Sequence, residues 1–284
     1  MNPLDAVLLG IVQGLTEFLP ISSTAHLTLT GKLLGLVGPN NPEAWTAFIA
    51  IMQLGTVAAV VGYFIKDVRR MMRSLLEDIR GNGFNFTLQG YSRASYLAIS
   101  IIVGTLPVVV IGFSFSHVIE GEITKSTPLI AASLVGLALL LWVAERVARH
   151  GRSIEDVNIW DALFVGFMQA LALIPGASRS GVTITAGLFL GFTRETAARF
   201  SFLLSIPAVV LSGLYEMTKI DASVFDLGIG NLLLATIVSA ISGYGAIHWL
   251  LKFLQRNSTM LFVWYRIGLA ALILLLLFFG MLES

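Results

Sequence analysis

The sequence predicts an all-helical polytopic membrane protein made of two inverted-topology repeats, each a re-entrant helical hairpin followed by three transmembrane helices. Of its 284 residues, 56% are hydrophobic and 12% are charged, whereas soluble domains carry about 25% charged residues. The mean hydropathy is +0.84. Six apolar segments are long enough to cross a bilayer, and the N-terminal region recurs later in the chain. This composition excludes soluble enzymes and nucleic-acid-binding proteins.

The recurrence is specific, because ten residues are identical at a spacing of 156 positions and several of them are polar. The first copy contains Asn2, Asp5, Ala6, Gly10, Gln13, Leu15, Ser22, Gly31, Leu34 and Gly35. The second contains Asn158, Asp161, Ala162, Gly166, Gln169, Leu171, Ser178, Gly187, Leu190 and Gly191. We therefore predict a first repeat over residues 1–150 and a second over 151–284, joined in one integrated membrane domain.

Each repeat begins with a hairpin, predicted at residues 2–37 and 158–192. Asn2 with Asp5, and Asn158 with Asp161, are typical of helix starts. The apolar segments 160–174 and 182–192 are too short to cross a bilayer, which needs about 20 residues. Irregular backbone at that depth persists only where protein or a water-filled cavity satisfies its polar groups. We therefore expect both hairpin turns to lie at a polar site inside the membrane.

Three apolar segments follow each hairpin. They lie near residues 45–65, 94–115 and 127–147, and near 199–217, 230–251 and 260–281. Three crossings are an odd number, so the second repeat enters the membrane with the opposite orientation, an arrangement known from transporter folds. The two hairpins then enter from opposite faces, and their turns meet near the middle.

Basic residues predict the orientation. Thirteen of the 18 Lys and Arg residues lie in segments 66–93, 145–158, 191–199 and 252–257, whereas three lie in the loops of the opposite side. The positive-inside rule therefore places both termini outside the cell. Residues 66–90 suit an ordinary basic loop better than an amphipathic helix on the inner leaflet. Arg266 is expected to reach the interface or a neighbouring helix.

The turn of the second hairpin, Pro175–Gly–Ala–Ser–Arg–Ser–Gly–Val–Thr183, carries an arginine between two apolar segments. An intramembrane charge indicates a functional site. Ser178, Arg179 and Ser180 lie where a helix start would present its free N–H groups, which favours an anion such as phosphate. The structural alternative is a hydroxyl-capped helix start whose arginine extends to an interface.

The first hairpin supplies complementary groups. Gln13 and Glu17 share one helix face, and Ser22, Ser23 and His26 follow the break. Such a set suits the cleavage of a phosphoric anhydride, which needs donors for phosphate oxygens, a carboxylate for a divalent metal, and a base or nucleophile. In the structural alternative, Glu17 and Arg179 form a neutralised pair that holds the hairpins together.

These residues resemble the undecaprenyl pyrophosphate phosphatase family, which is known for bacitracin resistance. Gln13–Gly–Leu–Thr–Glu17 fits its (E/Q)-x-x-x-E motif, Pro175–Thr183 fits P-G-x-S-R-S-G-x-T, and Ser22–His26 fits Ser-Ser-Thr-x-His. Gln13 stands where many members have a glutamate, which leaves Glu17 as the only acid of its motif. The resemblance covers the whole chain and its plan of two hairpins and six crossings.

The resemblance implies a bacterial inner-membrane enzyme that hydrolyses undecaprenyl diphosphate to undecaprenyl phosphate and inorganic phosphate at the outer face. It also implies Mg²⁺ or Ca²⁺, with Glu17, and Gln13 beside it, as the metal site. This activity recycles the lipid carrier of cell-wall synthesis. The expected partners are the bilayer and a polyprenyl diphosphate lipid, with a homodimer as an allowed assembly and no nucleic acid.

Each candidate residue has an expected role. Arg179, Ser178 and Ser180 bind the phosphates, with Thr183 in support, and Gln13 and Ser22 complete the binding set. Glu17 positions metal or acts as acid and base. His26 is the first choice for nucleophile or general base, and Ser23 the second, while attack by an activated water stays open. The alternatives are a transporter or flippase of a phosphorylated lipid and a non-catalytic lipid-binding scaffold.

Overall fold

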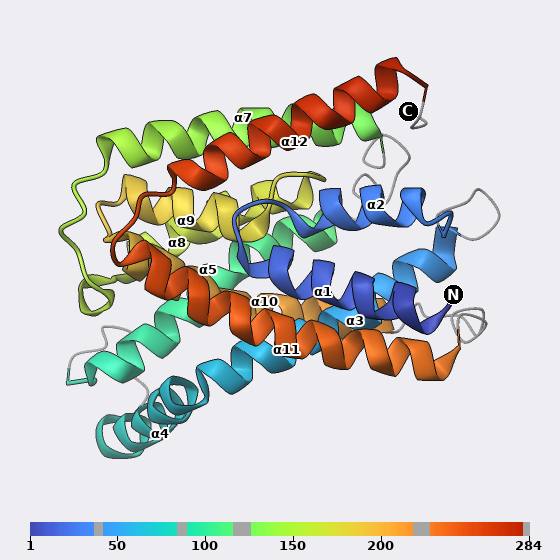
Figure 1. The fold of residues 1–284 in the computed structure, drawn as a ribbon. Helices are drawn as coiled ribbons and strands as arrows, with labels where there is room; N and C mark the ends of the chain where they lie inside the picture. The colour runs from blue at the N-terminus through green and yellow to red at the C-terminus, as the bar shows by residue number, and fades with distance from the viewer. Residues whose placement is uncertain (37–41, 84–89, 116–125, 218–227, 281–284) are drawn as a thin grey trace.

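The expected all-α class is confirmed over the residues that the structure describes. The computed structural model describes residues 1–36, 42–83, 90–115, 126–217 and 228–280. Within these ranges the chain forms eleven α-helices and two short 3-10 helices (Figure 1). An isolated backbone bridge joins Arg152 to Phe192.

The helices follow in the order of the two expected halves. The first half contains α1 (Pro3–Phe18), α2 (Ser23–Leu33), α3 (Pro42–Tyr63), α4 (Ile65–Asn82), α5 (Arg93–Ser114) and α7 (Thr127–Val147). The second half contains η2 (Ile154–Asp156), α8 (Ile159–Gln169), η3 (Ala170–Leu173), α9 (Arg179–Phe189), α10 (Arg194–Met217), α11 (Ile229–Leu254) and α12 (Met260–Phe278).

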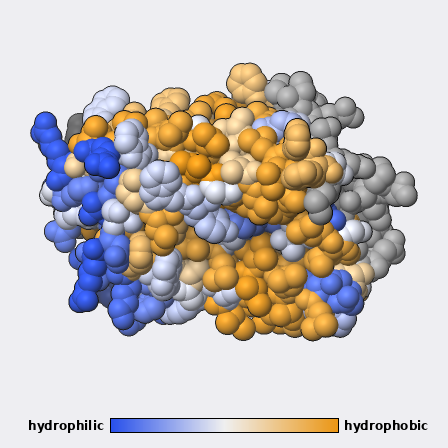
Figure 2. Space-filling model, turned by 45° about the horizontal axis from the view of Figure 1, so that its top comes forward, coloured by the Kyte–Doolittle hydropathy of each residue, from blue (hydrophilic) through white to orange (hydrophobic). Residues whose placement is uncertain are grey.

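The long apolar helices identify a multi-pass membrane protein. Within the described ranges, five helices are long and apolar enough to cross a bilayer, namely Arg93–Ser114, Thr127–Val147, Arg194–Tyr215, Ile229–Leu254 and Met260–Phe278. The bent pair α3 and α4 is a sixth candidate, with 69° between its two parts. Figure 2 shows hydrophobic residues over much of one face, with hydrophilic residues gathered at one end. Large exposed side chains such as Phe113 and Ile241 suit contact with lipid tails.

The segment expected to be a loop at residues 66–90 is instead mostly helix α4. Met71 is buried and Leu75, one turn later, packs against the same hydrophobic cluster, so α4 has an apolar stripe on one side. Asp78 accepts hydrogen bonds from the Ser92 N–H at 2.8 Å and the Ser95 hydroxyl at 2.5 Å, which joins the end of α4 to the start of α5. The loop expectation is wrong because the helical spacing of these apolar residues outweighs the density of charge. Residues 84–89 lie outside the described part.

Local structure recurs where the sequence recurs. Asn2 and Asp5 form a capping box at the start of α1, and Asn158 and Asp161 form the same box at the start of α8. These residues therefore mark helix starts, as expected. All four hairpin helices, at 16, 11, 11 and 11 residues, are shorter than a bilayer crossing.

Helix contacts bring the two halves together. α1 packs along α11, α8 packs along α5, and α7 lies beside α12 (Figure 1). Small residues allow the closest approaches. A Cβ atom on Gly10 would overlap the backbone carbonyl of Ala235, and one on Gly166 would overlap the carbonyl of Gly104. The core thus lies between halves rather than within each, which positions the hairpin turns against each other.

Candidate active site

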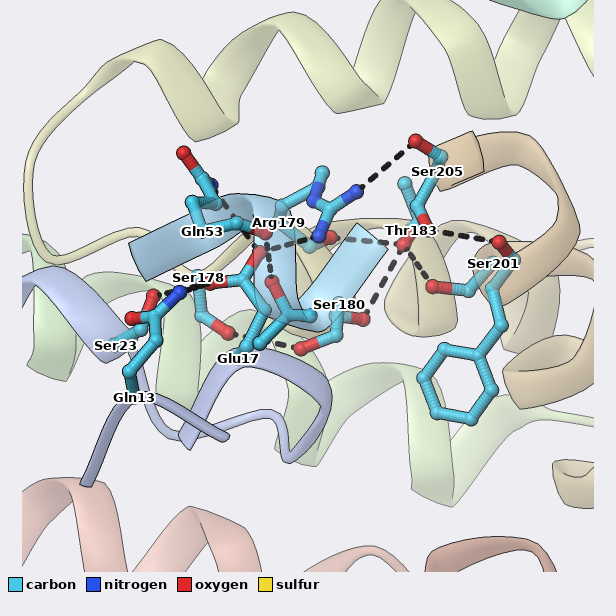
Figure 3. A network of polar contacts seen from close by, with 12 residues as sticks. Gln13, Glu17, Ser23, Gln53, Ser178, Arg179, Ser180, Thr183, Ser201 and Ser205 are labelled. Atoms are coloured by element: carbon cyan, nitrogen blue, oxygen red, sulfur yellow. Dashed lines mark hydrogen bonds and ion pairs between the residues drawn. The ribbon is translucent and has the colours of Figure 1, made fainter. Parts of the chain in front are cut away.

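Glu17 lies in the last turn of α1 and is almost fully buried. Its Oε1 accepts hydrogen bonds from Arg179 Nη2 at 2.5 Å and from Gln53 Nε2 at 3.5 Å. Its Oε2 accepts from Ser23 Oγ at 2.8 Å and from Gln13 Nε2 at 3.2 Å. Both carboxylate oxygens are therefore engaged, by groups from the two hairpins and from α3 (Figure 3).

Arg179 is the first residue of α9 and joins three helices. Besides its ion pair with Glu17 on α1, its Nη1 donates to the backbone carbonyl of Ser205 on α10 at 3.4 Å. A buried anion and a partly buried cation each need a partner, and here each supplies the other. The structure thus brings together two predicted residues that are 162 positions apart in the chain.

The helices α2 and α9 begin in the same unusual way. Their N-cap residues, Ser22 and Ser178, have positive φ angles of 75° and 68°, which are uncommon for residues other than glycine. The Ser22 hydroxyl accepts from the Ala25 N–H at 3.3 Å, and the Ser178 hydroxyl accepts from the Gly181 N–H at 3.2 Å. Such strain tends to persist where function requires it. Both helix N-termini carry a partial positive charge, and their N-cap residues line the same cavity.

A cavity of about 200 Å³ lies at these helix starts. Its lining consists of Glu17, Ser22, Ser23, Thr24, Gln53, Val108, Gln169, Ala172, Leu173, Ile174, Gly176, Ser178, Arg179, Ala208, Val209 and Ser212. The lining includes polar side chains, mostly from α1, α2, α3 and α9, and apolar side chains such as Val108 of α5, Leu173 of η3 and Val209 of α10. A polar head group and the first carbons of an apolar chain would both find matching surfaces here.

Three predicted binding residues, Gln13, Ser180 and Thr183, are not in the described lining, but each forms a hydrogen bond with a lining residue. Gln13 donates to Glu17, as described above. Ser180 donates to the carbonyl of Leu19 at 3.0 Å, which ties α9 to the end of α1. Thr183 donates to the carbonyl of Arg179 at 2.8 Å, and its hydroxyl lies 2.6 Å from that of Ser201. These contacts hold Arg179 and Glu17 in place.

His26 lies apart from this set. Its Nδ1 is 2.7 Å from the carbonyl of Ser22, and its Nε2 is 2.7 Å from the hydroxyl of Tyr265 on α12. Since a carbonyl only accepts, Nδ1 carries the proton and Nε2 accepts from the tyrosine. The ring stacks on Tyr265, with 5.6 Å between centroids. His26 is not among the described lining residues, and the hydrogen bonds of its ring nitrogens go to Ser22 and Tyr265 rather than to Glu17.

Arg266 supports the turn of the second hairpin. It is fully buried and donates to the carbonyls of Leu134 at 3.3 Å, Gly176 at 3.3 Å and Ala177 at 3.0 Å. The sequence led us to expect an arginine reaching the interface or a neighbouring helix, and its contacts with α7 and this turn agree with the second possibility. Gly176 has a φ of +84°, and a Cβ there would overlap the Ser133 hydroxyl. The turn is therefore shaped by its own backbone and by one buried cation.

Comparison with known proteins identifies the family. Residues 6–272 match the family described as bacitracin resistance protein BacA. The chain belongs to this family. It is 53% identical to the undecaprenyl-diphosphatase of Syntrophobacter fumaroxidans, over 98% of both chains. It is also 45% identical to the undecaprenyl-diphosphatase of Myxococcus xanthus, over 100% of this chain and 92% of that protein.

Within this BacA-family chain, sequence reasoning missed four polar lining residues, Thr24, Gln53, Gln169 and Ser212. Gln53 is a polar residue inside the apolar helix α3, and an intramembrane polar residue is itself a signal. Gln169 was visible as the repeat equivalent of Gln13, but nothing in the sequence assigned it to a site. Thr24 follows Ser23 directly and carried no separate signal.

A divalent cation needs oxygen ligands, and the residues around Glu17 are the candidates for holding one. Within the described residues there is no group of three or more His, Cys, Asp or Glu side chains that could hold a metal. However, the buried Oε1 of Gln13 has no hydrogen-bond partner in the described part of the chain. The Nε2 of the same amide donates to Glu17 Oε2, which also accepts from the Ser23 hydroxyl. Because Mg²⁺ is commonly held by one carboxylate together with substrate phosphates and water, this set fits such an ion.

Proposed function

We propose that the protein hydrolyses undecaprenyl diphosphate to undecaprenyl phosphate and inorganic phosphate, and so recycles a lipid carrier of cell-wall synthesis and confers bacitracin resistance. The full-length similarity to proteins named undecaprenyl-diphosphatase supports this reaction. The observation that carries it is the Glu17–Arg179 pair in the wall of a cavity that is lined by both polar and apolar side chains. A lipid diphosphate has the same division into a charged and an apolar part.

In this proposal the second hairpin binds the phosphates. Arg179 and the N–H groups at the start of α9 would donate to phosphate oxygens, with Ser178 beside them and Gln13, Ser22, Ser180 and Thr183 in support. In the free protein the Arg179 guanidinium is held by Glu17. An incoming phosphate oxygen takes the place of that carboxylate, so the cation keeps an anionic partner throughout. The exchange also releases Glu17 for proton transfer.

In this proposal the first hairpin supplies the nucleophile that attacks the terminal phosphorus and the group that accepts its proton. Ser23 Oγ already donates to Glu17 Oε2, so Glu17 can accept this proton as the oxygen bonds to the terminal phosphorus. The bond from that phosphorus to the bridging oxygen then breaks, and undecaprenyl phosphate leaves. Water subsequently releases inorganic phosphate from the serine. The alternative is direct attack on the phosphorus by a water molecule that Glu17 activates. To act as nucleophile or base, His26 would first have to break its contacts with Ser22 and Tyr265.

The metal proposal concerns Glu17, with Gln13 and Ser23 beside it. Bound Mg²⁺ or Ca²⁺ would neutralise charge on the diphosphate and so lower the barrier to attack by an anionic or hydroxyl oxygen. Glu17 and Gln13 would then orient the diphosphate with respect to Ser23. A chelator should abolish phosphate release, and added Mg²⁺ or Ca²⁺ should restore it. Full activity in the presence of a chelator would contradict this part.

The finer architecture is also a proposal, in which residues 1–150 and 151–284 form inverted repeats with re-entrant hairpins. The repeated capping boxes and N-cap angles support it. The helix contacts between the halves support it as well. α1 of the first half packs on α11 of the second, and α8, the repeat equivalent of α1, packs on α5 of the first. Such reciprocal contacts are expected for two halves related by a pseudo-two-fold axis.

We further propose a bacterial cytoplasmic membrane location with both termini outside and the cavity open to the outer face. α5 and α10 both begin at the basic end, at Arg93 and Arg194, and they contribute Val108 and Ser212 to the cavity from their later turns. The cavity thus lies toward the end remote from the basic residues, which the positive-inside rule places in the cytoplasm. A homodimer stays a prediction that native mass spectrometry can test.

The central experiment measures phosphate release from a polyprenyl diphosphate by the purified protein. We expect release by the wild type and a loss of at least about 100-fold in Arg179→Ala, because a preorganised donor to phosphate is removed. Arg73→Ala is the matched control, since this exposed arginine pairs with Glu77 one turn away on α4 and is not among the cavity-lining residues. Lipid exchange between leaflets without phosphate release would overturn the enzyme proposal and favour a flippase. Lipid binding without either activity would favour a scaffold.

A further inference from the structure

Gln169 is the last residue of α8, where the helix tightens into η3. Its side chain is 0% exposed, and it lines the cavity beside Ser178 and Arg179. Neither its Oε1 nor its Nε2 has a hydrogen-bond partner among the described residues. A buried amide without partners destabilises a fold, so native proteins rarely keep one unless a ligand or water completes it.

The repeat explains why this amide is unpaired. Gln169 is equivalent to Gln13 at the spacing of 156 residues, and Gln13 donates to Glu17. At the same spacing, the position equivalent to Glu17 is occupied by Leu173. The second repeat therefore keeps the amide but lacks the carboxylate that would bind it. Both amide atoms are therefore unpaired among the described residues, in a residue that lines the cavity.

We propose that Gln169 is a diphosphate-binding residue, whose Nε2 donates to a non-bridging phosphate oxygen. The inference rests on the proposed function and assigns a further residue to the same site. Arg179 and Gln169 would then hold the diphosphate from two sides, one by charge and one by a neutral hydrogen bond. A neutral donor suits this position, because it binds phosphate without adding a second buried cation.

The test compares Gln169→Leu with the wild type in steady-state phosphate release. We expect KM for the polyprenyl diphosphate to rise about 10- to 100-fold, the range for loss of one hydrogen bond to a charged group. The thermal unfolding midpoint should stay unchanged or rise, since an unpaired polar group is replaced by an apolar one of similar size. A merely structural glutamine would give the reverse pattern, a lower midpoint with an unchanged KM, and that result overturns the inference.

Ser100→Ala is the matched control. Ser100 on α5 is likewise 0% exposed, and its hydroxyl has no partner in the described part of the chain, but it does not line the cavity. Its replacement should leave kcat and KM unchanged. If Ser100→Ala raised KM as much as Gln169→Leu, the effect would not be specific to the cavity and the inference would fail.

A binding measurement separates this inference from the proposed function. Inorganic pyrophosphate should raise the unfolding temperature of the wild type, and this shift should shrink in Gln169→Leu. If the wild type releases no phosphate but shows the shift, the proposed reaction fails while Gln169 stands as an anion ligand. Equal shifts in both proteins, or no shift in the wild type, would refute the role of Gln169.

Discussion

At the scale of single residues, the site depends on how one carboxylate is shared. Glu17 accepts from an arginine, a serine and two glutamines, so its position is set by four side chains rather than by its own helix alone. Each contact is modest by itself, at about 1–3 kcal/mol for hydrogen bonds to charged groups. Together they fix the oxygen that would accept a proton.

The first prediction separates the two candidate nucleophiles. Ser23→Ala should lower kcat by about 100-fold or more, because the hydroxyl held by Glu17 is lost. His26→Ala should reduce kcat less, since His26 is not among the described lining residues and its ring nitrogens contact the Ser22 carbonyl and the Tyr265 hydroxyl. Acid quenching during turnover should trap phosphoserine. Recovery of phosphohistidine instead would reinstate His26 as the nucleophile.

The second prediction concerns Arg266, the buried cation that contacts the turn of the second hairpin. Arg266→Met removes three hydrogen bonds to backbone carbonyls and should lower the free energy of unfolding by on the order of 3 kcal/mol. KM should rise as well, because the turn that presents Ser178 and Arg179 loses its support. Thermal unfolding and steady-state kinetics measure the two effects. An unchanged unfolding midpoint would show that the carbonyls do not depend on Arg266.

At the scale of elements, close helix packing determines where the hairpins lie. α8 reaches α5 through Gly166, where even one added carbon meets the Gly104 carbonyl. The helix that carries Gln169 is therefore positioned by a contact one turn earlier. Moving α8 outward would also move η3, which forms part of the apolar wall of the cavity.

The third prediction follows from this contact. Gly166→Ala should destabilise the protein by about 1–3 kcal/mol, the usual cost of overpacking. Gly62→Ala on α3 is the control, because a Cβ at Gly62 meets nothing within 4 Å. That change should be neutral or stabilising, since alanine is the better helix former. Equal unfolding midpoints for the two variants would contradict the close contact.

At the scale of the whole molecule, the absence of cysteine in the sequence permits a direct test of orientation. Leu33, 67% exposed, lies at the end of α2, and Arg73, whose side chain is 82% exposed, lies in α4 at the basic end. In intact spheroplasts, a membrane-impermeant maleimide should label Leu33→Cys. Arg73→Cys should be labelled only after lysis. The opposite pattern would invert the proposed topology.

The general plan of the fold was accessible from the sequence because it rests on composition, segment length and an internal repeat. Glu17 and Arg179 could be paired in advance, since two opposite buried charges on facing hairpins need each other. The contacts of His26 could not be predicted, because its ring binds Tyr265 of α12, which is 239 positions away in the chain. Gln53 and Gln169 were not predicted as site residues, because a single polar residue in an apolar helix does not reveal which groups its side chain faces.

The serine and arginine that bind Glu17 have a further consequence. Ser23 and Arg179 are repeat equivalents, each the first residue of its helix, and each holds a different oxygen of the same carboxylate. Glu17 therefore links the two helix starts through its two oxygens. In the proposed mechanism, a diphosphate that replaces Glu17 on Arg179 would break only one of these links. Glu17 would then stay bound to Ser23 and be free to accept its proton, which would couple recognition of the head group to the first chemical step.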